Sequence, residues 1–358
     1  MLSSLLSRVA LLSLLHRYAT ANPLPADNAE VALSVDGALN VTIDADASNC
    51  FPALGFKMPS RTPSSLNNWW CPMSSEYAFM GFSYEVSQCQ SASKLKTEFA
   101  DIKKTFNGRY VRLYGACDRE GDDVVDAAWN AGIGVHALIW FGFDGGDIWK
   151  TRRDVLASAL HSNPRAKFVT RTVQFGSEPM FDWVLDMPTL ASEVRKYKQK
   201  LADLQIPVTV SDMAYSYQLQ APQGSAQVME AIDFIDAHML PFFAQDAATA
   251  DQAWPLVTRD LDWFYENGLG KKMYLSQNGW PNITYPGVEP NSPDAVADTP
   301  NEKAYFDLLD SKCRYFKTAP NGGVGWFAHI YSDYQEPGYG IYDKNMKLKF
   351  DFNPKTSC

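Results

Sequence analysis

A regular alternation of apolar, strand-like runs with helical segments is the feature that most restricts how this 358-residue chain can fold. Eight runs rich in β-branched and aromatic residues occur, and a helix-like segment separates each from the next; the runs are 78–84, 109–115, 133–141, 166–176, 206–212, 234–240, 272–278 and 323–331. Continuous apolar strands that alternate with helices are typical of parallel βα units. Eight such units over about 280 residues predict an α/β fold, the (β/α)8 or TIM barrel.

A doubly wound open sheet is the alternative architecture for the same alternation. It is disfavoured because no glycine-rich phosphate-binding turn follows the first run. Residues 22–77 precede the alternation and are predicted to form a short, cysteine-containing N-terminal extension, while residues 78–358 are predicted to form the barrel.

The first 21 residues are typical of a secretory signal peptide. Arg8 precedes an apolar run at 9–15, and the small residues Ala19, Thr20 and Ala21 offer a cleavage site. A buried core helix is the alternative for this segment. No other run is long and apolar enough to span a bilayer, and no lipid-anchor tail ends the sequence. The mature protein is therefore predicted to be extracellular.

Six cysteines fit an oxidising compartment, and their even number predicts three disulfides, with 15 pairings open. No C-x-x-C motif occurs and the five histidines are scattered, so neither a metal site nor a cofactor is expected. Two sequons, at Asn40 and Asn282, predict a glycoprotein. The net charge of −9, without a basic stripe, argues against nucleic acid and anionic membranes as partners.

In a barrel of this type, chemistry takes place at the C-terminal ends of the strands. Aromatic residues gather at these ends, namely Tyr114, Trp140, Phe141, Phe143, Trp149, Phe175, Trp183, Tyr215, Tyr217, Phe242, Phe243, Trp280, Trp326, Tyr331 and Tyr334. Flat rings suit the apolar faces of sugars, which favours a carbohydrate cleft. The alternative is that these rings fill the core beneath the loops.

Glu178 ends the fourth run among aromatic residues and is followed by Pro179. A partly desolvated carboxyl at this position suits a general acid, because burial favours its protonated form. The alternative is a solvated loop glutamate or an ion-pair partner of Arg112 or Arg171.

The sequences YVRLYG (110–115), FGSEP (175–179), PFF (241–243) and NGWP (278–281) resemble the strand ends of glycoside hydrolase family 17. The resemblance covers roughly residues 78–345 and implies a secreted barrel enzyme acting on β-1,3-glucans, closest to the fungal cell-wall type. It implies that Glu178 is the acid/base and that Gln277 occupies the position of the nucleophilic glutamate. The residues expected to bind the glucan are Arg112, Tyr114, Trp140, Ser177, Tyr215, Trp280 and Trp326.

Three departures from the family pattern bear on the mechanism. Gln277 has the shape of glutamate without its charge, so it does not readily form the covalent ester of a retaining glycosidase. Ser177 replaces the usual asparagine before the acid/base, and Ala328 stands where an acidic residue is common.

An enzyme with a changed mechanism then needs another carboxylate to activate water, at the wider spacing of inverting enzymes. Its candidates are Asp144, Asp212 and Asp333, with Asp118 and Glu120 less favoured; deamidation of Asn278 is disfavoured because residue 278 points away from residue 277 on a strand. Two alternatives stay open, a glucan-binding barrel with little or no hydrolysis and an unrelated secreted barrel. We favour retained hydrolase or transferase activity, because a pure binder has no use for an acid at residue 178.

Overall fold

Eight parallel strands form a closed barrel in the order of the sequence, as predicted. The computed structural model describes residues 49–358 except 118–119 and 143–145. The strands are β1 (Ala78–Glu85), β2 (Tyr110–Tyr114), β3 (Gly134–Leu138), β4 (Thr170–Ser177), β5 (Val208–Asp212), β6 (Ile235–Met239), β7 (Met273–Asn278) and β8 (Val324–Ala328).

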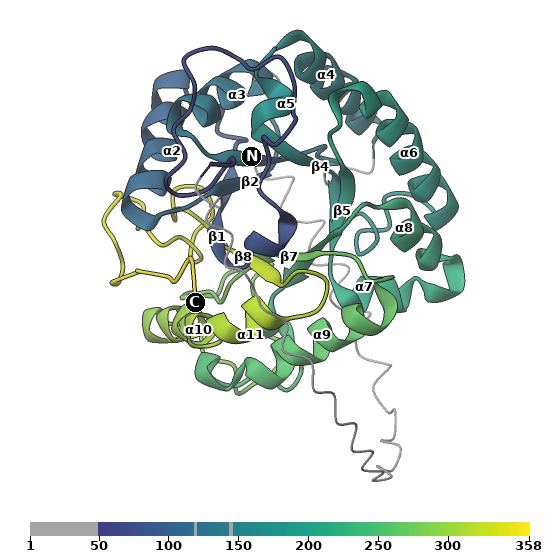
Figure 1. Ribbon diagram of the computed structural model, residues 1–358. Coiled ribbons are helices and arrows are strands. Elements are labelled where there is room, and N and C mark those ends of the chain that lie inside the picture. Colours follow the sequence, from purple (N-terminus) through teal and green to yellow (C-terminus); the bar gives the residue numbers. More distant parts are fainter. Residues whose placement is uncertain (1–48, 118–119, 143–145) are drawn as a thin grey trace, which may run out of the picture.

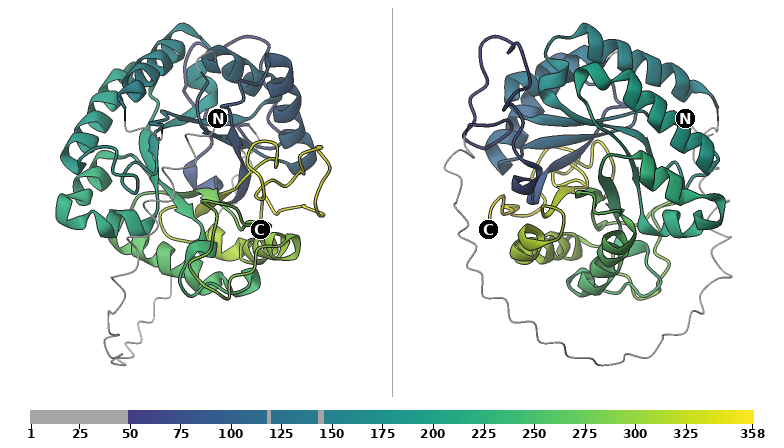
Figure 2. Two further views of the ribbon diagram at one scale, coloured as in Figure 1. Left: turned by 180° about the vertical axis from the view of Figure 1, so that it is seen from behind. Right: turned by 45° about the vertical axis from the view of Figure 1, so that its right-hand side comes forward.

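Helices surround the barrel as an outer layer (Figures 1 and 2). They are α2 (Ala92–Phe106), α3 (Glu120–Ala131), α4 (Ile148–Ser162), α5 (Ala166–Val169), α6 (Met187–Lys200), α7 (Ala214–Leu219), α8 (Ser225–Ala231), α9 (Trp254–Asn267), α10 (Thr299–Ser311) and α11 (Cys313–Thr318). One predicted strand began too early, because the first four residues of the run 166–176 form α5. A short apolar run does not by its periodicity distinguish a strand from a buried helical turn.

Helix α2 illustrates how the local sequence forms this layer. The Ser91 side chain caps its start by accepting a hydrogen bond from the Lys94 amide, and Asn107 ends it in the left-handed conformation. The residues buried between these caps recur at helical spacing: Leu95, Phe99, Ile102 and Phe106, with Glu98. One face of the helix is therefore apolar and packs on the barrel.

Strand parity decides which side chains enter the barrel. Tyr110 and Tyr274 point inward near the N-terminal end, where both hydroxyls donate to the carboxylate of Glu76. Arg171 forms an ion pair with Glu76 at 3.2 Å and is itself buried. This network fills the N-terminal end of the barrel, so the opposite end is the one available to a ligand.

Two register shifts alter that parity at the C-terminal end. Between Gln174 and Ser177, β4 carries one residue more than β5, and between Ala237 and His238 the pairing of β6 with β7 skips Ser276. An extra residue of this kind is a β-bulge, which changes the direction of the side chains that follow. The bulges lie on the two strands that carry Glu178 and Gln277.

Three disulfides form, Cys50–Cys71, Cys89–Cys117 and Cys313–Cys358, which resolves the pairing that the sequence left open. The first holds a segment without regular structure against α3 and α5, where Trp69 stacks on Trp129 and donates to the carbonyl of Phe168. In the described part of the chain, no helix is long and apolar enough to cross a membrane. The predicted signal peptide and residues 22–48 of the predicted extension, with Asn40, lie outside the described residues.

Candidate active site

Arg112 is the centre of a buried polar cluster at the C-terminal end of the barrel. Its Nε donates to Gln174 Oε1 at 2.9 Å, and its Nη1 donates to Gln277 Oε1 at 3.3 Å. Its Nη2 lies 2.9 Å from Ser177 Oγ and 3.0 Å from Ser211 Oγ. Burial lowers the pKa of Arg112 to about 10, which leaves the guanidinium charged at neutral pH. The structure thus brings together three predicted site residues, Arg112, Ser177 and Gln277.

Gln277 and Asn278 point to opposite sides of β7, as predicted. The Gln277 amide faces Arg112 inside the barrel, whereas Asn278 Oδ1 accepts a hydrogen bond from Tyr305 on α10 at 2.6 Å. The bulge at Ser276 explains why Gln277 points into the barrel. Tyr274 also points inward, so strict alternation along β7 would turn residue 277 outward. A carboxylate created at residue 278 would therefore lie outside the barrel.

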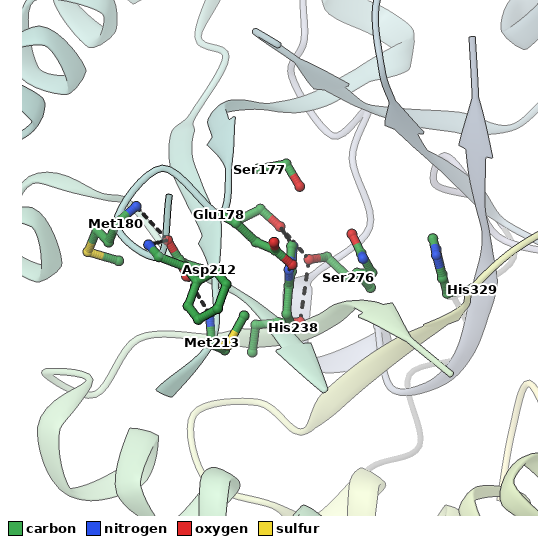
Figure 3. A network of polar contacts seen from close by, with 12 residues as sticks. Ser177, Glu178, Met180, Asp212, Met213, His238, Ser276 and His329 are labelled. Atoms are coloured by element: carbon green, nitrogen blue, oxygen red, sulfur yellow. Dashed lines mark hydrogen bonds and ion pairs between the residues drawn. The ribbon is translucent and has the colours of Figure 1, made fainter. Parts of the chain in front are cut away.

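Glu178 follows β4 in the left-handed conformation, with φ of 57°, and its amide donates to the carbonyl of Ser211. The neighbouring Gly176 has φ of +99°, and a Cβ there would lie 2.9 Å from the ring of Phe141. The sharp turn brings the Glu178 side chain back over the barrel, where its Oε1 lies 2.8 Å from His238 Nδ1 (Figure 3). The Glu178 side chain is 24% exposed.

Asp212 does not face this cluster, which corrects one predicted position for a second carboxylate. One of its oxygens accepts from the amide of Met180 and the other from the amide of Met213, so the carboxyl holds the β4 and β5 ends together (Figure 3). The side chain is fully buried, and burial raises its pKa to about 7. Asp212 follows the inward-facing Ser211, so strand alternation turns it outward.

The Asp333 carboxylate also binds groups outside the Arg112 cluster. Its Oδ1 accepts from the amides of Gly338 and Gly340, and Lys349 pairs with it at 3.1 Å. It therefore stabilises the turn after β8. Of the other candidates, Asp118 and Asp144 lie outside the described residues, as does the side chain of Glu120.

Two glutamates that sequence reasoning missed lie at the same end of the barrel. Glu336 follows β8 and pairs with His329, whose Nε2 lies 3.1 Å from Glu336 Oε2. Glu85 ends β1, and its pKa is raised by burial and by the charge of Glu336. The negative charges of Glu178 and Glu336 both oppose the lowering of the Arg112 pKa by burial.

The family model of the BtgE/BtgC glycoside hydrolase domain matches residues 78–343, a span that begins with β1 and contains the whole barrel. The chain belongs to this family. A search of curated proteins finds no match.

Solved structures of glycoside hydrolases share the fold of this BtgE/BtgC-type domain. The family 17 β-1,3-glucanosyltransferase of Rhizomucor miehei has a TM-score of 0.61 at 19% identity, covering 78% of this chain and 98% of its own. An active-site mutant of the Rhizomucor miehei enzyme, in complex with laminaritriose, has a TM-score of 0.62 at 19% identity with the same coverage. The β-1,3-glucanase CJP38 of Cryptomeria japonica pollen gives 0.53 at 15%, covering 78% of this chain and 99% of its own. The resemblance to glycoside hydrolase family 17 is thus confirmed at the level of the fold.

Most aromatic residues gathered at the strand ends are core residues in this BtgE/BtgC-type domain. Trp280 is 1% exposed and donates its Nε1–H to the carbonyl of Val296, while Trp326 is fully buried and stacks on Phe306. Trp326 neighbours the inward-facing Phe327, so strand alternation turns it toward the helices. Neither indole offers a face to a sugar, which differs from the binding role predicted for both.

The other aromatic residues predicted to bind the glucan, Tyr114, Trp140 and Tyr215, keep an accessible surface. The rings of Tyr114 and Trp140 are half-buried, with centroids 5.1 Å apart, and the Arg112 guanidinium lies 5.5 Å from the Tyr114 ring. Tyr215 is 43% exposed, and Trp183, beyond Glu178, is 53% exposed.

Sequence reasoning also missed Gln174, Ser211 and His238 of this cluster. A signal existed, because Asp236 and His238 alternate with the apolar residues of β6 and so share the inward face of the barrel. Within the described residues, no group of three or more histidine, cysteine, aspartate or glutamate side chains is arranged to hold a metal ion.

Proposed function

We propose that the protein is a secreted glycoside hydrolase or glycosyltransferring enzyme that acts on β-1,3-glucan, with Glu178 as the acid/base. The observation that carries this proposal is the placement of Glu178, partly exposed at the C-terminal end of the barrel beside the buried Arg112 cluster. Membership in a glycoside hydrolase family and the β-1,3-glucan enzymes among the similar structures support the substrate class.

The chemistry begins at the glycosidic oxygen. Glu178 donates a proton to this oxygen as its bond to the anomeric carbon breaks, and the sugar acquires oxocarbenium character. Arg112 does not stabilise that positive charge, but it orients Gln277 and Ser177, which line the same side of the cluster. Tyr114 and Trp140 provide ring faces for neighbouring sugar units.

Gln277 removes the nucleophile of a double displacement, so we propose a single displacement by water. Glu336 is the candidate base: it takes one proton from water as the water oxygen bonds to the anomeric carbon. Its pairing with His329 and its influence on Arg112 support this role, since both place it at the site end of the barrel. A single displacement inverts the anomeric configuration.

A glucan-binding barrel without hydrolysis is the second candidate. The observation that favours it is the contact between Arg112 and the neutral amide of Gln277, because this amide occupies the proposed nucleophile position without its charge.

Product analysis on laminari-oligosaccharides tests the proposal. We expect the wild type to cleave these oligosaccharides, and Glu178→Gln to lower turnover by roughly 10²-fold or more, the scale of a lost general acid. The matched control is Glu266→Gln, on the exposed surface of α9, which leaves turnover unchanged. Binding without turnover by the wild type would instead support the second candidate.

A further inference from the structure

The two ring nitrogens of His238 have different neighbours. Nδ1 lies 2.8 Å from Glu178 Oε1, whereas Nε2 lies 2.6 Å from Ser211 Oγ and 3.2 Å from Arg112 Nη2. The His238 side chain is fully buried, so water does not compete for either nitrogen. Ser211 Oγ also lies 2.8 Å from Ser276 Oγ, which links β5, β6 and β7 inside the barrel.

These neighbours determine which nitrogen carries the proton. An arginine guanidinium has only donors, and the two hydrogens of Nη2 are directed at its nearer neighbours, Ser177 Oγ and Ser211 Oγ. Ser211 Oγ accepts one of them and gives its own hydrogen to His238 Nε2, 2.6 Å away. Nε2 is then the unprotonated nitrogen, because it accepts this hydrogen and because Arg112 Nη2, 3.2 Å away, has no lone pair that could accept a proton from it. In the neutral ring the proton is therefore on Nδ1, where it points at the Glu178 carboxyl. Burial, together with the charge of Arg112, lowers the pKa of His238 and so favours this neutral ring, although Glu178 opposes the shift.

We propose that His238 is a positioning residue, fixed as the Nδ1–H tautomer by Arg112 and Ser211, which donates to Glu178 and sets the acidity at which Glu178 becomes a proton donor. The assignment of the tautomer and of the donor stands on geometry alone. Its consequence for catalysis rests on the proposed function of Glu178.

The direction of the effect follows from the charges around the carboxyl. A hydrogen-bond donor stabilises a carboxylate relative to the protonated acid, and the positive charge of Arg112 acts in the same direction. The carboxyl of Asp212 opposes them when ionised. Glu336, whose charge also acts on Arg112, is paired with His329. We therefore expect Glu178 to take up its proton at a lower pH than it would without His238, and the part of the pH profile of turnover that depends on this proton to move in the same direction.

The tautomer can be tested without any substrate. In the ¹⁵N NMR spectrum of the histidine-labelled wild type, we expect His238 Nε2 to show the signal of an unprotonated ring nitrogen and Nδ1 that of a protonated one. Spectra of His238→Asn identify the resonances by their loss. A proton on Nε2, or a doubly protonated ring near neutral pH, would overturn the proposal.

Two variants of similar size then separate the donor from the shape of the side chain. His238→Asn places an amide nitrogen near the position of Nδ1 and retains a donor, whereas His238→Leu removes it. We expect the ¹³C titration midpoint of the Glu178 carboxyl to lie roughly one pH unit higher in the Leu variant than in the Asn variant. If the protein is an enzyme, the pH profile of turnover moves in the same direction.

The outcomes distinguish the two proposals. If the two midpoints coincide while both variants are folded, the role of His238 is wrong, whether or not the protein hydrolyses glucan. If the midpoints differ as expected and the wild type does not turn over substrate, the proposed function is wrong and the role of His238 as donor stands.

Discussion

At the scale of single residues, one amide decides the chemistry proposed for this site. Gln277 keeps the hydrogen-bonding position that a glutamate would occupy, and its Oε1 accepts from Arg112 at 3.3 Å. A carboxylate there would form an ion pair with a guanidinium that is already buried and charged. The surrounding structure therefore suits either residue, and the difference between them is chemical.

Restoring the carboxylate is the first prediction at this scale. Gln277→Glu is expected to raise turnover of laminari-oligosaccharides by roughly 10²-fold or more and to give products of retained configuration, because it returns a nucleophile opposite Glu178. Rates and product anomers measured by NMR check this. Gln174→Glu, which also places a carboxylate beside Arg112, is the control and should not give retention. An inactive Gln277→Glu variant that is folded would contradict the assignment of residue 277.

The second prediction concerns pH and stability. Burial raises the pKa of Asp212 to about 7, so the folded protein holds a proton there that the unfolded chain releases near pH 4. The contribution to stability is therefore complete below about pH 4 and is lost as the pH rises to about 7. Thermal unfolding of the wild type should show this loss, and Asp212→Asn should remove that part of the slope. Equal slopes for both proteins would contradict the shift.

At the scale of elements, the bulges explain what the sequence could predict and what it could not. Apolar runs and helical spacing identified all eight strands, and the rule for barrels identified Glu178 and Gln277 as residues of one end. The resemblance to glycoside hydrolase family 17 added Arg112. Strand parity was the weaker guide, because Trp326 and Asp212 turn outward by simple alternation while the bulge at Ser276 turns Gln277 inward. A bulge depends on how neighbouring strands pair, which a single sequence does not display.

The pairing of β1 with β8 shifts register between Phe79 and Gly81, and Gly81 allows a prediction about this irregularity. Its φ is +150°, and a Cβ would lie 1.8 Å from the carbonyl oxygen of Tyr110 on β2. Gly81→Ala should therefore lower the free energy of unfolding by roughly 2–5 kcal/mol, measured by denaturant titration. Gly55→Ala is the control, since nothing lies within 4 Å of its added Cβ, and it should change stability by less than about 0.5 kcal/mol. Similar values for the two variants would show that β1 relaxes around the added methyl group.

At the scale of the whole molecule, the disulfides indicate the cellular compartment in which the protein folds. All six cysteines pair, and Cys313–Cys358 joins α11 to the last residue of the chain across 45 positions. Disulfides persist in oxidising compartments, which agrees with the predicted signal peptide and with the extracellular location that we propose.

The predicted secretion can be tested without an activity assay. The protein recovered from the medium of a secreting host should begin at Asn22 and show no free thiol by labelling under denaturing conditions. Reduction should then lower the unfolding temperature, because the three cross-links no longer restrict the unfolded chain. An N-terminus at Met1, or reactive thiols in the folded protein, would contradict the predicted processing.

The measurement that tests the central claim most directly is the configuration of the first product. Laminari-oligosaccharides incubated with the wild type should give a reducing end that is initially the α-anomer in ¹H NMR, since water attacks once with Glu178 as acid and Glu336 as base. Glu336→Gln should abolish this product while leaving the fold intact. An initial β-anomer, or no product from a protein that binds the oligosaccharide, would contradict the account.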